Sequence, residues 1–232
     1  MIDKISIGIV GCGWLGKPLA KVLTDTYNVE CYSRENTTDD SSFWQSDTII
    51  IAINTKDNYL QTLQKIATLT ASTSTIILMS SISVYREFDT VVDESAVIIK
   101  TGRQREAEEL MQGLRDKLVI LRLGGLMGDD RISGKWKSIS IFADGEVNYI
   151  HRDDVINITK NILEQNIQSG IYNLVAPKHP LRSEVHKKNS KAFGLELGTF
   201  EGRTHREVSS QKVVKELNYT FLHPDPLEFW SQ

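Results

Sequence analysis

The feature that most constrains this chain is a glycine-rich turn near its start, Gly11-Cys12-Gly13-Trp14-Leu15-Gly16. The turn follows a β-rich run at 4–10 and opens a helical pattern at 14–24, which is the setting of a dinucleotide-binding fingerprint. Gly11 would make the tight turn, Gly13 would let the backbone approach a pyrophosphate, and Gly16 would let the helix lie close to the sheet. The first amides of the helix would face the phosphates. A turn that binds nothing and the nucleotide loop of a methyltransferase are the alternatives; the setting favours a dinucleotide.

β-Rich runs alternate with helical patterns through the first half of the chain. Strands are predicted at 4–10, 28–33, 48–54, 75–80 and 118–123, and helices at 14–24, 57–69 and 102–114. The run TIIIAI at 48–53 is apolar on both faces, as expected of a strand covered by helices on both sides. This alternation predicts an α/β fold of the Rossmann type, with a doubly wound parallel sheet.

The sequence changes character after residue 123. Five glycines fall within 124–145, in a loop-rich region beyond the carboxyl end of a strand, where open α/β sheets bind ligands. A helix at 154–165 and a strand at 171–175 follow, and the remainder predicts a small helical part. We therefore expect a dinucleotide-binding core at 1–125, a substrate loop at 126–149, a helix and strand returning to the core at 150–176, and a small C-terminal substrate domain at 177–232.

Composition and charge exclude several classes of protein. Of the 232 residues, 40% are hydrophobic and 25% are charged, which rules out collagen-like, disordered and disulfide-scaffold chains. A net charge of -3 gives no reason to expect nucleic acid or an anionic membrane surface as a partner. The run TIIIAI is also too short to span a bilayer. Neither the small-molecule substrate nor the oligomeric state follows from these patterns.

The two cysteines bear on the compartment. We expect Cys12 and Cys31 to be free thiols in a reducing compartment, and their spacing from the five histidines makes no zinc site. The segment Ile9-Val10-Gly11-Cys12 would pass as a lipoprotein cleavage box. However, only five residues, 5–9, lead into it, fewer than the roughly 7–15 of a signal-peptide core. We therefore expect a cytoplasmic protein.

The end of the second strand bears on the choice between NAD and NADP. A carboxylate there would accept a hydrogen bond from the ribose 2′-hydroxyl of NAD, whereas a basic residue would pair with the 2′-phosphate of NADP. Ser33 and Arg34 favour NADP, since a guanidinium binds phosphate through two parallel hydrogen bonds. Glu35 argues for NAD, and an exposed loop arginine is ordinary. We expect NADP or NAD, with NADP preferred. The predicted cofactor contacts are Gly11, Cys12, Gly13, Trp14, Leu15, Gly16, Ser33, Arg34, Asn54 and Ser80.

Six short motifs in order along the chain carry a family resemblance. They are GIVGCGWLG at 8–16, SSISVY at 80–85, LRLGGLMG at 121–128, IHRDDV at 150–155, GIYNL at 170–174, and SS at 209–210 leading to LNY at 217–219. With these motifs the chain resembles the extended NAD-dependent epimerase/dehydratase branch of the short-chain dehydrogenases, and within it the small atypical, YeeZ-like members. The resemblance implies a Rossmann core with a smaller C-terminal substrate domain.

The catalytic residues of that family are only partly present. Its active members use a Tyr-x-x-x-Lys pair and a serine or threonine, and by resemblance Ser81 takes the serine position, where its hydroxyl would bond the reacting oxygen. Thr101 stands at the tyrosine position and Arg105 at the lysine position. A threonine hydroxyl does not ionise usefully near neutral pH, and Arg105 keeps its charge but never releases its proton. Thr101 and Gln104 also fit a capping box, which we favour over a catalytic role for Thr101.

Other polar side chains near these motifs are candidates for chemistry or for structure. Tyr85 is a catalytic candidate, although the matching tyrosine in the family is mainly structural, and Tyr149 is another. His151 is expected to be a hydrogen-bonded loop residue. Asp153 and Asp154 are expected to cap the following helix and to interact favourably with its dipole.

Two classes of function follow from these observations. The first is an NAD(P)-binding oxidoreductase or epimerase-like enzyme that acts on a nucleotide sugar or a small polar substrate. The second is a non-catalytic NADP(H)-binding sensor or regulatory module, suggested by the missing tyrosine and lysine. A nucleotide-dependent transferase that uses the same loop is a third. The segment 35–47 is too short for the strand that the family usually has there, which weakens the expected recognition of adenine.

Overall fold

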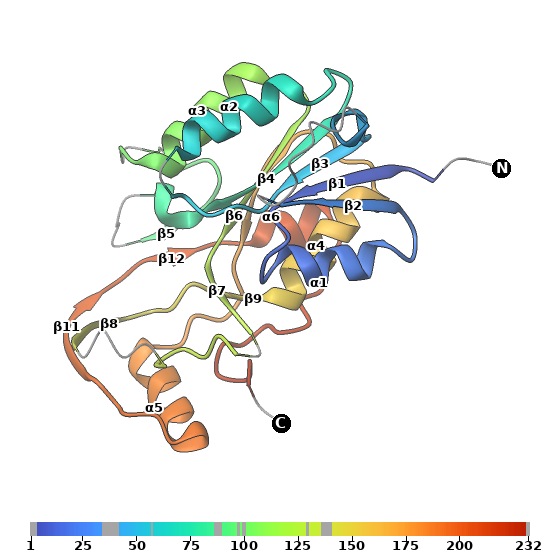
Figure 1. Ribbon diagram of the computed structural model, residues 1–232. Coiled ribbons are helices and arrows are strands. Elements are labelled where there is room, and N and C mark those ends of the chain that lie inside the picture. Colours follow the sequence, from blue (N-terminus) through green and yellow to red (C-terminus); the bar gives the residue numbers. More distant parts are fainter. Residues whose placement is uncertain are drawn as a thin grey trace. The chain divides into compact units, whose positions relative to one another are not determined.

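A six-stranded parallel β-sheet organises the α/β fold, with its strands in the order β10-β6-β4-β3-β1-β2 (Figure 1). The computed structural model describes residues 4–33, 42–56, 58–85, 90–96, 98, 101–128, 130–135 and 141–230. The strands of this sheet are β1 (Ser6–Val10), β2 (Asn28–Tyr32), β3 (Thr48–Ile51), β4 (Thr75–Ser81), β6 (Leu118–Leu123) and β10 (Gly170–Leu174). The predicted Rossmann-type fold class is confirmed.

Helices and short strand pairs complete the described part of the chain. The helices are α1 (Gly16–Leu23), α2 (Tyr59–Leu69), α3 (Arg103–Leu114), α4 (Arg152–Glu164), α5 (Arg182–Phe193) and α6 (Gln211–Glu216), with 3₁₀ turns η1 (Phe43–Gln45) and η2 (Ile82–Val84). Small two-stranded sheets pair β5 (Val91–Val92) with β12 (Glu207–Val208), β7 (Gly125–Met127) with β9 (Tyr149–His151), and β8 (Ile141–Gly145) with β11 (Thr199–Thr204).

The chain divides into two compact units, and each is assembled from three segments. Unit 1 comprises Met1–Val84, Ile98–Arg122 and Thr159–Tyr172. Unit 2 comprises Tyr85–Val97, Leu123–Ile158 and Asn173–Gln232. The glycine-rich turn belongs to unit 1, and the small two-stranded sheets belong to unit 2.

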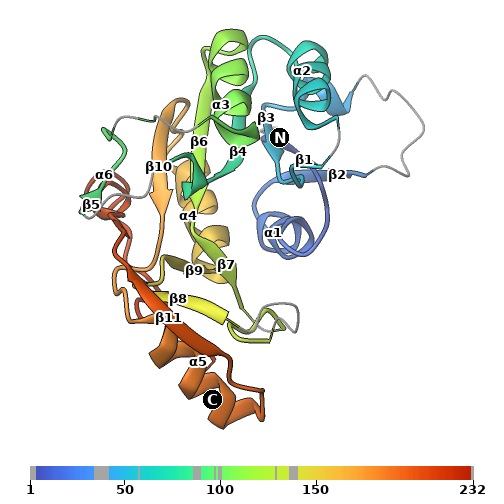
Figure 2. The same ribbon diagram turned by 90° about the vertical axis from the view of Figure 1, so that its left-hand side faces the viewer.

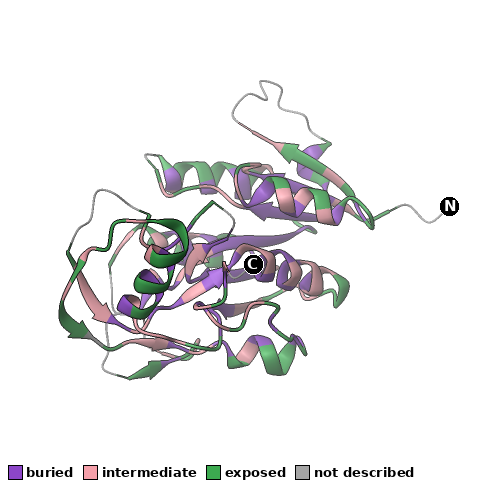
Figure 3. Cartoon of the chain, turned by 90° about the horizontal axis from the view of Figure 1, so that it is seen from below, coloured by how far each residue is buried: buried purple, intermediate pink, exposed green. Residues whose placement is uncertain are grey.

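Burial explains why the aliphatic runs form the central strands. All residues of β3 and β6 are buried, and Figure 3 shows buried residues along the central strands. Helices α2 and α3 pack on one face of the sheet and α1 lies on the opposite face (Figures 1 and 2). Strand β1 lies between β2 and β3, so the connections leave it in opposite directions. In open α/β sheets this topological switch point is where ligands bind.

Two sequence-based expectations about elements are wrong. The C-terminal part is not only helical, because β11 and β12 lie between α5 and α6. The capping box at Thr101 does not form: α3 begins at Arg103, its N-cap is Gly102, and no side chain caps it. The other predicted strands and helices of the first half are present, with ends that differ by a few residues. Among the helices that the structure describes, none has both the length and the apolar character needed to cross a membrane.

Candidate functional site

Gly11 makes the turn between β1 and α1. Its φ is +101°, a left-handed conformation that favours glycine, and its amide donates a 3.0 Å hydrogen bond to the carbonyl of Tyr32 at the end of β2. A Cβ at this position would lie 2.5 Å from the carbonyl oxygen of Ala52, just after β3. Both the backbone conformation and the packing therefore require glycine here.

The other two glycines of the turn differ sharply in their surroundings. A Cβ on Gly16 would lie 2.3 Å from the carbonyl oxygen of Gly11, so glycine is needed for α1 to start this close to the turn. A Cβ on Gly13 would meet nothing within 4 Å, and Gly13 is exposed. The fold itself therefore explains Gly11 and Gly16, whereas no packing contact explains Gly13.

The N-terminus of α1 faces this turn. The helix starts at Gly16, its N-cap Leu15 makes no side-chain cap hydrogen bond, and its first turn has no acidic residue. The amide of Lys17 bonds back to the carbonyl of Gly13 at 3.0 Å, which fixes the turn against the helix. A helix end of this kind presents amides and a positive dipole end to an anion. Leu15 is buried and Trp14 is half-buried, so both are also packing residues.

The carboxyl ends of the neighbouring strands lie beside the glycine-rich turn. Ser33 follows β2 and is half-buried, and Asn54 is exposed two residues beyond Ala52, whose carbonyl group lies against Gly11. The predicted contacts Ser33 and Asn54 thus belong to the segments that flank the turn. Arg34, on which the preference for NADP depends, lies outside the described residues.

The expectation of two free thiols is wrong. Cys12 and Cys31 form a disulfide, with their Cα atoms 5.9 Å apart. The parallel register of β1 and β2 sets Cys31 opposite Ile9, and Cys12 follows three residues after Ile9. The bond therefore joins the glycine-rich turn to the neighbouring strand.

Ser80 takes part in a buried polar network of unit 1. Its hydroxyl donates a 2.5 Å hydrogen bond to Glu108 on α3. Glu108 also forms an ion pair with Arg122 of β6, at 2.8 Å, and both charged side chains are about fully buried. This network ties β4, α3 and β6 together, so Ser80 has a structural partner besides any cofactor.

The residues at the family's catalytic positions lie at the end of β4 and the start of α3, two elements that pack together. The Ser81 oxygen accepts a 3.1 Å hydrogen bond from the amide of Ser83, which leaves its hydroxyl hydrogen for donation. Thr101 is exposed before α3. Arg105 pairs with Glu109 at 2.7 Å and also donates to the carbonyl of Ile98. Its guanidinium is thus bound within the protein.

The two tyrosine candidates both have internal partners in unit 2. Tyr85 is completely buried, and its hydroxyl donates a 2.8 Å hydrogen bond to Asn173. The hydroxyl of Tyr149 lies 2.8 Å from that of Ser133. Burial and this bond favour a structural role for Tyr85.

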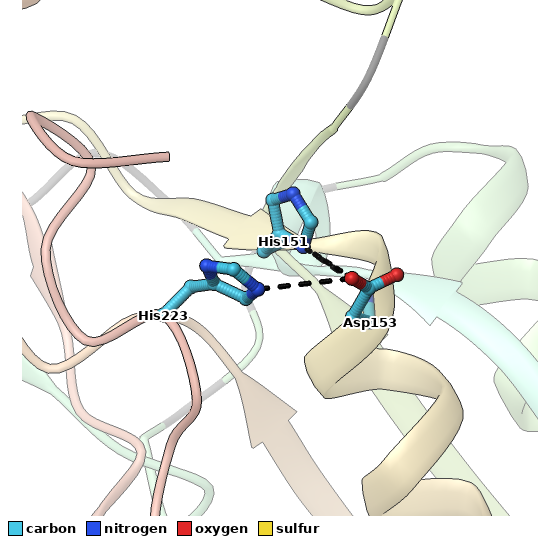
Figure 4. Close-up of side chains that lie close together, drawn as sticks. All are labelled: His151, Asp153 and His223. Carbon is cyan, nitrogen blue, oxygen red and sulfur yellow. Dashed lines mark hydrogen bonds and ion pairs between the residues drawn. The ribbon is translucent and has the colours of Figure 1, made fainter. Parts of the chain in front are cut away.

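His151, Asp153 and His223 form a second cluster in unit 2 (Figure 4). Nδ1 of His151 accepts the amide of Asp153 at 3.2 Å, so His151 caps the start of α4. The rings of His151 and His223 lie with their centroids 3.8 Å apart and their planes tilted by 36°. The Asp153 carboxylate lies 3.6 Å from Nδ1 of His151 and 3.7 Å from Nε2 of His223. These are metal-ligating residue types, and one possible ligand atom of each lies within 4.8 Å of the others. Nδ1 of His151 accepts the Asp153 amide, so the contacts seen here describe a helix cap.

Asp154 differs from its neighbour Asp153. It is completely buried, and its carboxylate accepts hydrogen bonds from the Tyr219 hydroxyl and from the amides of Leu222 and His223, at 2.7–3.0 Å. Burial, followed by the nearby Asp154 carboxylate, raises the pKa of Tyr219, which keeps this phenol a proton donor. Both aspartates lie in the first turn of α4, where a carboxylate interacts favourably with the helix dipole as expected. The expected capping role does not hold for Asp154, whose carboxylate bonds the 219–223 segment instead. Asp154 also anchors the 219–223 segment, which sequence reasoning did not show.

Sequence reasoning missed three features. An arginine inside the otherwise aliphatic β6 signals a buried partner, but not that Glu108 supplies it. The Cys12–Cys31 pair depends on the register of two strands, and the partners of Asp154 lie more than sixty positions away. In each case the residue type is visible in the sequence and its partner is not.

Comparisons with known proteins place the chain among relatives. No protein-family model matches it. Protein YeeZ of Escherichia coli strain K12 is 28% identical over 266 aligned positions, which cover 95% of this chain and 97% of YeeZ. Human epimerase family protein SDR39U1, solved with NADPH, has a TM-score of 0.74 at 14% identity and covers 97% of both chains. UDP-glucuronic acid 4-epimerase from Bacillus cereus, solved with NAD, has a TM-score of 0.74 at 17% identity and covers 97% of this chain and 96% of its own.

These matches run over nearly the whole length of the chain and agree with its α/β fold around a parallel central sheet. The predicted resemblance is confirmed: the chain is a homologue of YeeZ and has the fold of the NAD-dependent epimerase/dehydratase and short-chain dehydrogenase proteins.

Proposed function

We propose that the chain binds a nicotinamide dinucleotide on the glycine-rich turn at 11–16. The observation that carries this proposal is the open space at Gly13, the one glycine of the three that the fold does not explain. A missing side chain there leaves room for a diphosphate against the backbone. The uncapped start of α1 adds amides and a favourable dipole. The structural neighbours that hold NADPH and NAD support the same assignment.

Different residues around the turn would contact different parts of the cofactor. The backbone at Gly13 and the start of α1 would hold the diphosphate, and Ser33 and Asn54 at the strand ends would line its two sides. Arg34 follows Ser33 directly and would pair with a ribose 2′-phosphate, which is why we propose a preference for NADP over NAD. Tighter binding of NADH than of NADPH in a titration would contradict this preference.

We further propose an oxidoreductase or epimerase-like reaction on a nucleotide sugar or a small polar substrate. The bound nicotinamide would supply hydride transfer. The hydroxyl of Ser81 would donate a hydrogen bond to the reacting oxygen, since its bond with Ser83 uses only a lone pair. The likeness to a UDP-sugar epimerase supports this substrate class.

A second candidate, a non-catalytic NADP(H)-binding module, is favoured by the surroundings of the substituted catalytic positions. Thr101 has no phenol to ionise, and Arg105 is bound to Glu109 and to the carbonyl of Ile98. Tyr85 is buried and bonded to Asn173. Loss of a general acid typically lowers a rate by about 10²–10⁴-fold. Cofactor binding would survive this loss.

Two glycine variants test the binding proposal. Gly13→Ala adds a methyl group that the protein itself accommodates, so we expect unchanged thermal stability and a loss of NADPH affinity of at least roughly tenfold. Gly113 on α3 is also open within 4 Å, and Gly113→Ala is the matched control, with affinity unchanged. Affinities come from titration calorimetry. Equal NADPH binding by the wild type and Gly13→Ala, or no dinucleotide binding by the wild type, would refute the proposal.

A measurement of turnover distinguishes the proposed enzyme from the proposed non-catalytic NADP(H)-binding module. Sugar nucleotides and small carbonyl compounds are screened with NADPH and NADH, and the cofactor absorbance is followed. For the enzyme we expect turnover by the wild type that falls by roughly 10²-fold or more in Ser81→Ala. Dinucleotide binding without turnover across the panel would instead favour the module.

We keep the cytoplasm as the proposed location. Disulfides of cytosolic proteins are usually transient, catalytic or redox-sensing. In this location the Cys12–Cys31 bond is therefore expected to open and close.

A further inference from the structure

We propose that Cys12 and Cys31 are a redox-modification site that controls dinucleotide affinity, the disulfide form binding more tightly than the dithiol. This inference rests on the proposed binding function of the glycine-rich turn. Its partner is a cellular dithiol of the thioredoxin class, recognised by the chemistry of thiol–disulfide exchange. The site lies entirely within unit 1.

The disulfide acts directly on the turn that would hold the diphosphate. Cys12 stands between Gly11 and Gly13, and Cys31 lies one residue before Tyr32, whose carbonyl accepts the amide of Gly11 at 3.0 Å. The covalent bond and this hydrogen bond therefore fix the same short segment to the end of β2. When the disulfide opens, the hydrogen bond remains and the covalent restraint is lost.

The loss of this restraint explains the direction of the effect. In the disulfide form the turn already has the positive φ of Gly11, the open Gly13 and the close start of α1 that diphosphate binding uses. A freed turn reaches more conformations, and the binding of the cofactor must then order it. Preorganisation of a binding loop raises affinity by removing this ordering cost.

The bond is placed for exchange with an external thiol. Cys31 is exposed on β2, the outermost strand on that side of the described sheet, whereas Cys12 is half-buried. A reductant thiolate would attack Sγ of Cys31, form a mixed disulfide, and release Cys12 as a thiolate. Cys12 lies near the N-terminus of α1, whose positive dipole end favours a thiolate.

The exchange balances without a further reactant. The second thiol of the reductant then attacks the reductant's first sulfur, which is bonded to Cys31 in the mixed disulfide, and Cys31 is released as a thiol. The protein disulfide gains two electrons and two protons, and the external dithiol becomes a disulfide. Because Cys12 and Cys31 are the chain's two cysteines, no third thiol of this chain competes for either sulfur.

The test compares the two redox states of one protein. The wild type is prepared as the disulfide and as the dithiol, each verified by the mass shift on alkylation, and its NADPH and NADH affinities are titrated. Reduced thioredoxin serves as the reductant. The double variant Cys12→Ser with Cys31→Ser is the matched control, since it cannot form the bond. Circular dichroism confirms that each sample is folded at the temperature of titration.

We expect the disulfide form to bind roughly tenfold more tightly than the dithiol, and the double serine variant to bind like the dithiol in the presence and absence of reductant. Equal affinities of the two redox states would overturn the inference and leave the proposed binding function intact, as would tighter binding by the dithiol. If neither state bound either dinucleotide, the binding function would fail and the inference with it. Failure of thioredoxin to open the bond would overturn the assigned partner.

Discussion

In unit 1, packing requires glycine at some positions, whereas another buried position holds a charged side chain. Gly11 and Gly16 have no room for a side chain, whereas Arg122 places a guanidinium inside a fully buried strand. A buried charge is tolerated when it is paired and hydrogen-bonded, and Glu108 provides the partner at 2.8 Å. The glycines in a turn and the arginine in an aliphatic run are visible in the sequence as local anomalies. The pairing of Glu108 with Arg122 cannot be seen in the sequence, since α3 and β6 meet only in the fold.

The stability of unit 1 depends on the buried Glu108–Arg122 pair. Glu108→Gln leaves the buried Arg122 without its carboxylate, and we expect unfolding in urea to require about 3–5 kcal/mol less free energy. Glu109, the adjacent residue, is the matched control: it is half-exposed and pairs with Arg105, so Glu109→Gln should cost less than about 1 kcal/mol. Equal losses in the two variants would show that burial of the pair is not what matters.

Elements with long buried runs were predictable, and elements made by distant pairing were not. The run at 118–123 matches β6 at both ends because its aliphatic residues are apolar on both faces. Strand β11 has a glycine at φ +67° and charged residues, so its sequence shows no alternation, and it exists through pairing with β8. The glycine-rich turn was predictable for the opposite reason, since the tight turn at Gly11 and the close start of α1 at Gly16 depend on a short stretch of sequence.

The first turn of α4 holds the 219–223 segment through Asp154. Asp154 accepts from the Tyr219 hydroxyl and from the amides of Leu222 and His223, so Asp154→Ala removes the acceptor of three donors. Each buried donor left unpaired costs roughly 1–3 kcal/mol. We therefore expect the free energy of unfolding to fall by a few kcal/mol and the amides of 222 and 223 to exchange hydrogen faster.

Asp153 provides the comparison for that experiment on the same helical turn. Its carboxylate is about half-exposed and lies 3.6 and 3.7 Å from the two histidines, so Asp153→Ala should change stability by less than about 1 kcal/mol. In this variant the backbone amide of residue 153 can still donate its hydrogen bond to Nδ1 of His151. If Asp153→Ala destabilised the protein as much as Asp154→Ala, the assigned anchoring role of Asp154 would be wrong.

Buried histidines are expected to make the stability of unit 2 more sensitive to acid than that of unit 1. His186 of α5 packs against the rings of Phe142 and Phe200, with centroids 4.8 and 5.5 Å away. Burial, with a smaller contribution from Arg182, lowers the pKa of His186 to about 4. Burial also lowers the pKa of His179. Both residues belong to unit 2.

The sign of the pH dependence follows from which state binds the proton. Below a pH of about 6.5 an unfolded histidine is protonated, whereas folded His186 stays neutral until about pH 4. Its stabilising contribution is therefore complete above about pH 6.5 and is lost as the pH falls toward 4. The loss approaches about 1.4 kcal/mol per pH unit within that window. Burial raises the pKa of Glu94 in the same unit, which opposes this trend in its lower part.

The comparison of the wild type with His186→Leu isolates this contribution. Urea unfolding is measured from about pH 8 to about pH 4, and hydrogen exchange reports which segments open. We expect the wild type to lose stability on acidification with unit 2 opening first, and His186→Leu to show a slope smaller by up to about 1.4 kcal/mol per pH unit between about pH 6 and 4. The other titrating groups remain in the variant, so the difference between the two curves belongs to His186. Parallel curves would mean that His186 takes up its proton equally well in the folded and unfolded chain, contrary to its burial against the rings of Phe142 and Phe200.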